Sequence, residues 1–90
     1  MRGRRDRRDR NEKGICAGLQ AVGATITRIS GTGAPDVLVR FRGRLYAFEI
    51  KTATGTRTPA QVESNWPIVR DVTDALIAIG AVSRGKRGIA

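Results

Sequence analysis

Two carboxylates and a lysine are the residues of this sequence whose types and spacing could support chemistry. Asp36 directly precedes a strand-like run at residues 37–41, and Glu49 and Lys51 lie at the end of a second run that starts at residue 44. An Arg-Gly dipeptide alone joins the two runs, as in β-hairpins with a two-residue turn. This turn length predicts a register in which Asp36 stands directly opposite Glu49.

Opposed carboxylates on paired strands repel each other, because their Cβ atoms lie about 4.5 to 5.5 Å apart. The pair therefore indicates a bridging cation, and oxygen ligands of this kind suit Mg²⁺ or Mn²⁺. Such a cation would activate water for phosphodiester hydrolysis close to Lys51, which alternation places on the same face as Glu49. The alternative is structural: Asp36 belongs to a turn, and Glu49 and Lys51 form an edge-strand ion pair that contributes little stability.

The elements that must position these residues are predicted by apolar periodicity and by capping residues. In order, we expect a helix from Asp9 or Asn11 to Gly23, a strand at residues 25–29, the hairpin, a short helix opened by Thr58-Pro59 and ended by Pro67, a strand at residues 67–70, and a helix at residues 72–79 capped by Asp71. This αβββαβα order predicts a small α/β domain with a mixed sheet flanked by helices. Its apolar sheet face comprises Val37, Val39, Phe41, Tyr46, Phe48 and Ile50.

The positive charge is concentrated at the two ends of the chain. The 90 residues carry a net charge of +9, with six arginines among residues 1–10 and three basic residues among residues 84–90. We predict a disordered arginine-rich arm at residues 1–10, one folded domain at residues 11–83 and a flexible basic tail at residues 84–90. Basic arms on a nearly neutral body are typical of proteins that bind the phosphate backbone of nucleic acids, although such an arm can also serve solubility alone.

Several function classes are excluded by composition. The sequence has no histidine and a single cysteine, Cys16, which rules out an internal disulfide, a zinc finger and histidine-based catalysis. No apolar run approaches the ~18 residues of a membrane span, and no apolar segment follows the N-terminal arginines as in a signal peptide. We therefore expect an intracellular protein without a membrane partner, because the arm also lacks the apolar residues of an amphipathic anchor.

The segments around the carboxylates resemble a nuclease signature. Gly33-Ala34-Pro35-Asp36, Glu49-Ile50-Lys51 and Thr58-Pro59-Ala60-Gln61 together resemble the motif of the PD-(D/E)xK nucleases. Within that superfamily the chain is most similar to the VRR-NUC (virus-type replication-repair nuclease) domain, whose small stand-alone members occur in phages. The likeness runs from about Glu12 to Val82, and it implies a small PD-(D/E)xK core and an origin in a phage or prokaryote, acting in bacterial cytoplasm.

The resemblance also assigns roles at the site. It implies that Asp36, Glu49 and the backbone carbonyl of Ile50 hold Mg²⁺ or Mn²⁺, with no small-molecule cofactor. Lys51 would orient the attacking water or stabilise the charge that develops on the phosphate. The expected reaction is that of an endodeoxyribonuclease.

Two further residues match the family pattern outside the central motif. Gln61 matches a helical glutamine beside the site, and Glu12 matches a first-helix acid that completes the acidic cluster. From the residues alone, Glu12 could instead be favoured by the helix dipole. Gln61 could equally be the third-position partner of Thr58 in a capping box.

The substrate predictions rest on charge and on the resemblance. Phosphate contacts are expected from Arg4, Arg5, Arg7, Arg8, Arg57 and Arg70, although the last two could simply be solvated. Trp66 is a more natural core or dimer-interface anchor than a base-stacking platform. Stand-alone members of the family resemble Holliday junction resolvases and act as homodimers, which makes branched DNA the leading substrate. The rival hypothesis is a non-catalytic basic module that binds DNA or RNA.

Overall fold

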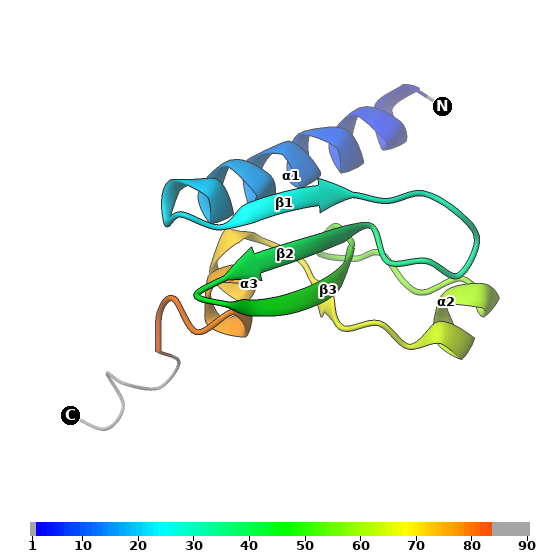
Figure 1. Cartoon of the computed structure of the whole chain (residues 1–90). Helices are drawn as coiled ribbons and strands as arrows, with labels where there is room; N and C mark the ends of the chain where they lie inside the picture. Colours follow the sequence, from blue (N-terminus) through cyan, green and yellow to red (C-terminus); the bar gives the residue numbers. More distant parts are fainter. Residues whose placement is uncertain (1, 84–90) are drawn as a thin grey trace.

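A four-stranded sheet with helices around it forms the body of the protein (Figure 1). The structure, a computed structural model, describes residues 2–83, with side chains from residue 10 onward. The elements in chain order are α1 (Arg2–Ala21), β1 (Thr25–Arg28), β2 (Val37–Phe41), β3 (Arg44–Ile50), α2 (Pro59–Ser64), β4 (Ile68–Val69) and α3 (Val72–Ala78). This confirms the predicted αβββαβα order. The predicted basic tail at residues 84–90 lies outside the described residues.

The sheet is mixed, as predicted, and its strands follow the chain in the order β1-β2-β3-β4. The first three strands are antiparallel, and β4 pairs in parallel with β3 after the crossover through α2. The two-residue turn of the hairpin is confirmed, because Arg42 and Gly43 both have positive φ values of 51° and 78° and Phe41 pairs with Arg44. Figure 1 shows α2 beside the end of the sheet that lies away from this turn.

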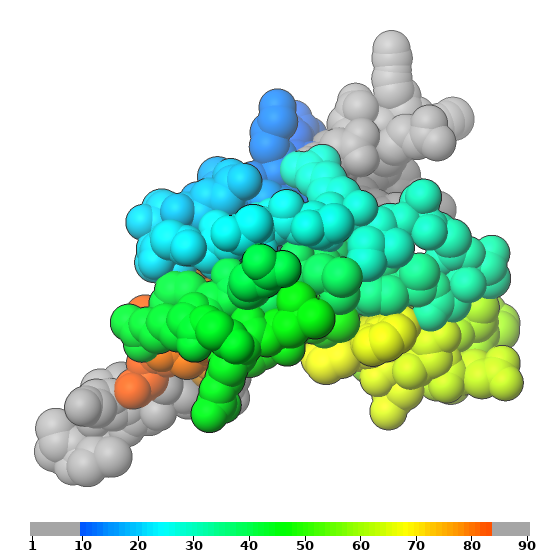
Figure 2. Space-filling view, in the orientation of Figure 1, coloured from blue at the N-terminus to red at the C-terminus, as the bar shows by residue number. Residues whose placement is uncertain are grey.

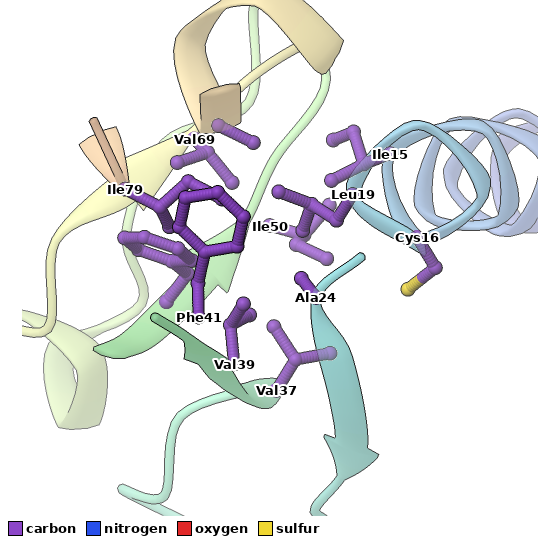
Figure 3. Packing of buried hydrophobic residues seen from close by; sticks show 12 residues of the cluster. Ile15, Cys16, Leu19, Ala24, Val37, Val39, Phe41, Ile50, Val69 and Ile79 are labelled. Atoms are coloured by element: carbon purple, nitrogen blue, oxygen red, sulfur yellow. The ribbon is translucent and has the colours of Figure 1, made fainter. Parts of the chain in front are cut away.

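The core lies between the sheet and the pair of helices α1 and α3, which pack against each other. Figure 3 shows Ile15 and Leu19 of α1 directed towards Ile50, Val39 and Phe41 of the sheet. The predicted apolar sheet face is confirmed, since five of its six members are buried and Tyr46 packs against them. Because this face is buried, the register of the hairpin is strongly specified.

The first helix begins much earlier than predicted. It starts at Arg2 rather than at Asp9 or Asn11, so residues 2–10 form a helical extension instead of the expected disordered arm. The physical reason is helix propensity: six of these residues are arginines, which are good helix formers, and the poorer formers Gly3, Asp6 and Asp9 stand singly among them. The end of the helix is as predicted, with Gly23 at a φ of 96° just beyond Ala21.

The two helices approach each other most closely at Gly18. A Cβ atom on Gly18 would lie 2.5 Å from Cγ1 of Val72, which is far inside van der Waals contact. Gly14, one turn earlier in the same helix, has no atom within 4 Å of an added Cβ. Packing of α1 against α3 therefore requires glycine at position 18 but not at position 14.

We expect Gly18→Ala to lower the free energy of unfolding by about 1–3 kcal/mol, because β-branched Val72 cannot move away without shifting α3. Gly14→Ala is the matched control, and it should raise the free energy of unfolding by about 0.5–1 kcal/mol through helix propensity. Urea denaturation followed by circular dichroism measures both. Equal stability of the two variants would contradict this account of the helix contact.

Candidate active site

Asp36 lies at a β-bulge and does not form a regular pair with Glu49. The ladder between β2 and β3 ends at Val37 and Phe48, and the N–H of Asp36 also donates to the carbonyl of Phe48 at 2.9 Å. Two residues of one strand thus face a single residue of the other, which is the arrangement of a β-bulge. Pairing cannot continue further, because Pro35 has no N–H. The prediction that Asp36 and Glu49 stand directly opposite each other in the ladder is therefore wrong.

The bulge nevertheless brings the Asp36 carboxylate to the residues that follow Glu49. Its Oδ2 accepts a hydrogen bond of 2.7 Å from the N–H of Ile50. The Asp36 carboxylate therefore contacts the peptide unit that joins Glu49 to Ile50. Asp36 thus lies beside the strand end that carries Glu49, and a cation held by both carboxylates stays a prediction.

Glu49 is a buried acid at the junction of β3, β4 and α2. It is 1% exposed, its N–H donates to the carbonyl of Pro67 at 2.8 Å, and it pairs with Ile68 across the parallel strands. The side-chain amide of Gln61 donates from Nε2 to Oε2 of Glu49. Burial of a charged carboxylate is tolerated where polar donors compensate for lost water, and Gln61 is one such donor.

Gln61 performs both of the roles that the sequence left open. Its Oε1 accepts from the N–H of Thr58 at 2.8 Å, and its own N–H donates to Oγ1 of Thr58 at 3.3 Å, so the capping box of α2 is present. Only one orientation of the amide lets Oε1 accept at the cap while Nε2 donates to Glu49. The helix cap therefore fixes the side chain that contacts the buried acid.

Lys51 follows β3 directly and is half-buried. Its N–H donates to the carbonyl of Val69 at 3.2 Å, so it continues the pairing with β4. Its carbonyl accepts from Nδ2 of Asn11 in α1 at 3.0 Å. The lysine is thus held by its main chain at the same end of the sheet as the two carboxylates.

Glu12 pairs with a basic residue of β1. Its Oε2 lies 3.6 Å from Nη1 of Arg28. Among residues 10–83, no group of three or more His, Cys, Asp or Glu side chains could hold a metal ion. The structure thus gathers no cluster of three such ligands in this part of the chain, and the role of Glu12 stays a prediction. The other predicted oxygen donors are Asp36, Glu49 and the carbonyl of Ile50.

Cys16 lies close to the Glu12 and Arg28 pair and takes no part in the site. Burial raises the pKa of its thiol above the ordinary value, while the neighbouring Arg28 acts in the opposite direction. A raised pKa keeps the thiol protonated and unreactive near neutral pH. Its place in the core next to Ile15 makes it a packing residue.

Two arginines predicted to bind phosphate donate to main-chain carbonyls of the protein. Nη2 of Arg57 lies 2.9 Å from the carbonyl of Trp66. Nη1 of Arg70 lies 2.6 Å from the carbonyl of Thr52 and 2.8 Å from that of Gly55. Both side chains thus tie loops together, and their contact with phosphate stays a prediction. Side chains of the other four predicted contacts, Arg4, Arg5, Arg7 and Arg8, are not among those the structure describes.

Trp66 anchors the loop that carries Asp36. Its Nε1 donates to the carbonyl of Gly33 at 2.8 Å, and Gly33 has a φ of 83° that favours glycine. Figure 2 shows this loop packed against the α2 segment on the surface of the molecule. The indole therefore serves the fold, in line with the anchoring role that the sequence favoured.

Sequence reasoning did not single out Asn11, whose side chain donates to the carbonyls of Lys51 and Arg70. Asn11 carried no readable signal, because these partners lie 40 and 59 residues away in the chain. Exposed arginines surround the hairpin turn at Arg40, Arg42 and Arg44, and the guanidinium of Arg42 lies 4.7 Å from the ring centre of Phe41.

Comparison with known proteins supports the fold. No family model matches the chain, and no curated protein matches it. A solved structure described as a VRR_NUC domain is similar, with a TM-score of 0.66 and 23% sequence identity over 79% of this chain and 94% of that one. The chain therefore has the VRR-NUC fold, and the fold prediction is confirmed.

No helix among the described residues is long and apolar enough to cross a membrane.

The contact between Gln61 and Glu49 leads to a pH-dependent prediction. Gln61→Glu keeps an acceptor for the capping box but places a second carboxylate against buried Glu49. Two adjacent carboxylates cannot both ionise without cost, so we expect the variant to lose about 1–3 kcal/mol of stability at pH 7 and less at pH 5, where one of them can be protonated.

Urea denaturation at the two pH values measures this difference. Glu63→Gln is the control, because Glu63 is an exposed acid on the same helix and its neutralisation should change stability little at either pH. A Gln61→Glu variant that is as stable as the parent protein at pH 7 would show that the carboxylate of Glu49 does not depend on this amide.

Proposed function

We propose that this chain is a Mg²⁺- or Mn²⁺-dependent DNA endonuclease. Its active site, formed by Asp36, Glu49 and Lys51, would hydrolyse phosphodiester bonds. The observation that supports the proposal is the hydrogen bond from the N–H of Ile50 to the Asp36 carboxylate. It brings Asp36 to the strand end that carries Glu49 and Lys51, the neighbours of Ile50 in the chain. The VRR-NUC fold supports the same activity, because its domain name is that of a nuclease.

The donors present fit a hard divalent cation. Asp36, Glu49 and the carbonyl of Ile50 supply oxygen atoms, and a cation that keeps several waters needs few protein ligands. When bound there, Mg²⁺ or Mn²⁺ would lower the pKa of water and polarise the phosphate. Gln61 would hold Glu49 in position, as its hydrogen bond with Oε2 does now.

Lys51 is the cationic residue of this group, and its ammonium can act on the reacting phosphate. A positive charge beside the phosphate stabilises the negative charge that grows on its oxygens during attack. The same ammonium can orient the water by hydrogen bonding. Because Lys51 follows β3 directly and its main chain is paired with Val69, the base of its side chain is well defined.

DNA is the substrate that the charge distribution favours. The arginine-rich half of α1 ends immediately before Asn11, the residue that contacts the carbonyl of Lys51. A dense positive charge thus adjoins the site, where it can neutralise phosphates on either side of the scissile bond. We assign Arg4, Arg5, Arg7 and Arg8 to this role.

Branched DNA and a homodimer are the finer part of the proposal. Two symmetric sites are what paired cuts at a four-way junction require. A chain of 90 residues buries a modest share of its surface, and a second copy would cover exposed apolar side chains such as Leu45, which is 65% exposed. Both the junction preference and the dimer rest on these arguments and on the resemblance of the motif.

The test is cleavage of a labelled four-way junction and a matched linear duplex, with Mg²⁺, with Mn²⁺ and with chelator. Metal-dependent, symmetric nicks in the junction are expected from the parent protein. Asp36→Ala and Lys51→Ala should each lower the cleavage rate by about 100-fold or more, because each removes a group that acts on the reacting phosphate or its cation. Their affinity for the junction, measured with chelator present, should change little.

Glu63→Ala and Lys13→Ala are matched controls, since both replace exposed charges outside the site. They should cleave at the parent rate. Full cleavage by Asp36→Ala and Lys51→Ala would overturn the proposal. Binding without cleavage under every metal, lost when Arg4, Arg5, Arg7 and Arg8 are changed to Gln, would favour the non-catalytic nucleic-acid-binding module.

A further inference from the structure

The loop that follows Lys51 is held by two side chains from distant elements. Residues 51–58 lie between β3 and α2 and belong to neither a helix nor a strand. Asn11 of α1 donates from Nδ2 to the carbonyl of Lys51 at 3.0 Å and to that of Arg70 at 3.2 Å. Arg70, which follows β4, donates from Nη1 to the carbonyls of Thr52 and Gly55. One connected network therefore joins α1, the loop and the end of β4.

We infer that Asn11 and Arg70 are positioning residues for Lys51, and that Arg70 serves the loop in preference to the DNA backbone. The inference rests on the proposed function, since it concerns the same lysine. It assigns a new role to Asn11 and a different role from phosphate binding to Arg70.

The physical need for such residues lies in the length of the lysine side chain. Four rotatable bonds separate its ammonium from the main chain, so the ammonium is well placed only if the main chain and the stem are both restrained. The main chain of Lys51 is restrained by Asn11 on its carbonyl and by Val69 on its N–H. A misplacement of about 1 Å at a reacting group is enough to cost roughly 100-fold in rate.

The loop itself restrains the stem of the lysine. An added Cβ on Gly55 would lie 3.4 Å from both Cβ and Cδ of Lys51, so the loop passes directly over the aliphatic part of the side chain. The loop stays there because its carbonyls, which lack strand partners, are satisfied by Arg70. Releasing Arg70 would free the loop and with it the lysine stem.

Arginine suits this place by reach and rigidity. Its Nη1 amino group supplies the bonds to the carbonyls of Thr52 and Gly55. This nitrogen lies one bond further from the main chain than a lysine ammonium would, and the planar guanidinium fixes its orientation. Arg70 is half-buried, and its own N–H is held by Oδ2 of Asp74 at 3.0 Å. The base of the side chain is thus fixed by α3 while its tip holds the loop.

Arg70→Lys separates the two roles of the residue, because it keeps the positive charge but draws the donor nitrogen one bond back from the loop carbonyls. We expect its single-turnover cleavage rate at saturating protein to fall at least about 10-fold, with DNA affinity in chelator within about twofold of the parent. Asn11→Ala should show the same split between rate and affinity. Arg40→Lys and Lys13→Ala are the matched controls at exposed positions, and they should change neither quantity.

Thermal melting confirms that each variant is folded at the assay temperature, and amide hydrogen exchange reports on the loop. Exchange at residues 52–56 should accelerate in Arg70→Lys while exchange in β2 and β3 stays slow. If Arg70→Lys does not fold, the cleavage rate and DNA affinity of Asn11→Ala test the positioning of Lys51. If Asn11→Ala does not fold, Arg70→Lys provides the same test.

Three results would overturn the inference. The first is a parent-like cleavage rate in both variants. The second is DNA binding by Arg70→Lys that is weakened as much as its cleavage rate, which is the behaviour of a bidentate phosphate contact. The third is unchanged exchange in the loop. A parent protein that does not cleave at all would instead refute the proposed function, and the exchange measurement would still test the hold on the loop.

Discussion

Burial of the Glu49 carboxylate is the constraint on which the rest of this structure depends. An ionised carboxylate removed from water costs several kcal/mol unless hydrogen bonds and nearby charges compensate for it. Glu49 is 1% exposed, so its carboxylate depends on polar groups that other elements bring to it. Gln61 supplies one donor, and the parallel pairing with β4 through Ile68 fixes the strand on which Glu49 lies.

That constraint explains why such a short chain carries so many connections at one end of its sheet. The capping box aims Gln61, the indole of Trp66 holds the loop before Asp36, and the bulge at Asp36 turns its carboxylate to the N–H of Ile50. Asn11 and Arg70 complete the surroundings from α1 and from the end of β4. Each contact joins a local feature of the sequence to a partner far along the chain.

What could be predicted from the sequence was local. The two-residue turn, the apolar face of the hairpin and the cap at Thr58 depend on neighbouring residues, and all three are confirmed. The start of α1 and the bulge at Asp36 were not predictable in the same way. The first depends on helix propensity outside the amphipathic pattern, and the second on the missing N–H of Pro35. The pairing of Glu12 with Arg28 likewise joins two elements that meet only in the fold. The carbonyl partners of Arg57 and Arg70 likewise exist only once the chain has folded.

The central claim is that Asp36 and Glu49 together hold a divalent cation beside Lys51. Titration of Mn²⁺ into the isotopically labelled protein, followed by NMR, tests it most directly, because a bound paramagnetic ion broadens nearby amide signals even when binding is weak. The account predicts selective broadening centred on residue 36 and residues 49–51, and its loss in a folded Asp36→Asn variant. Broadening centred elsewhere, or unchanged by that substitution, would contradict the account.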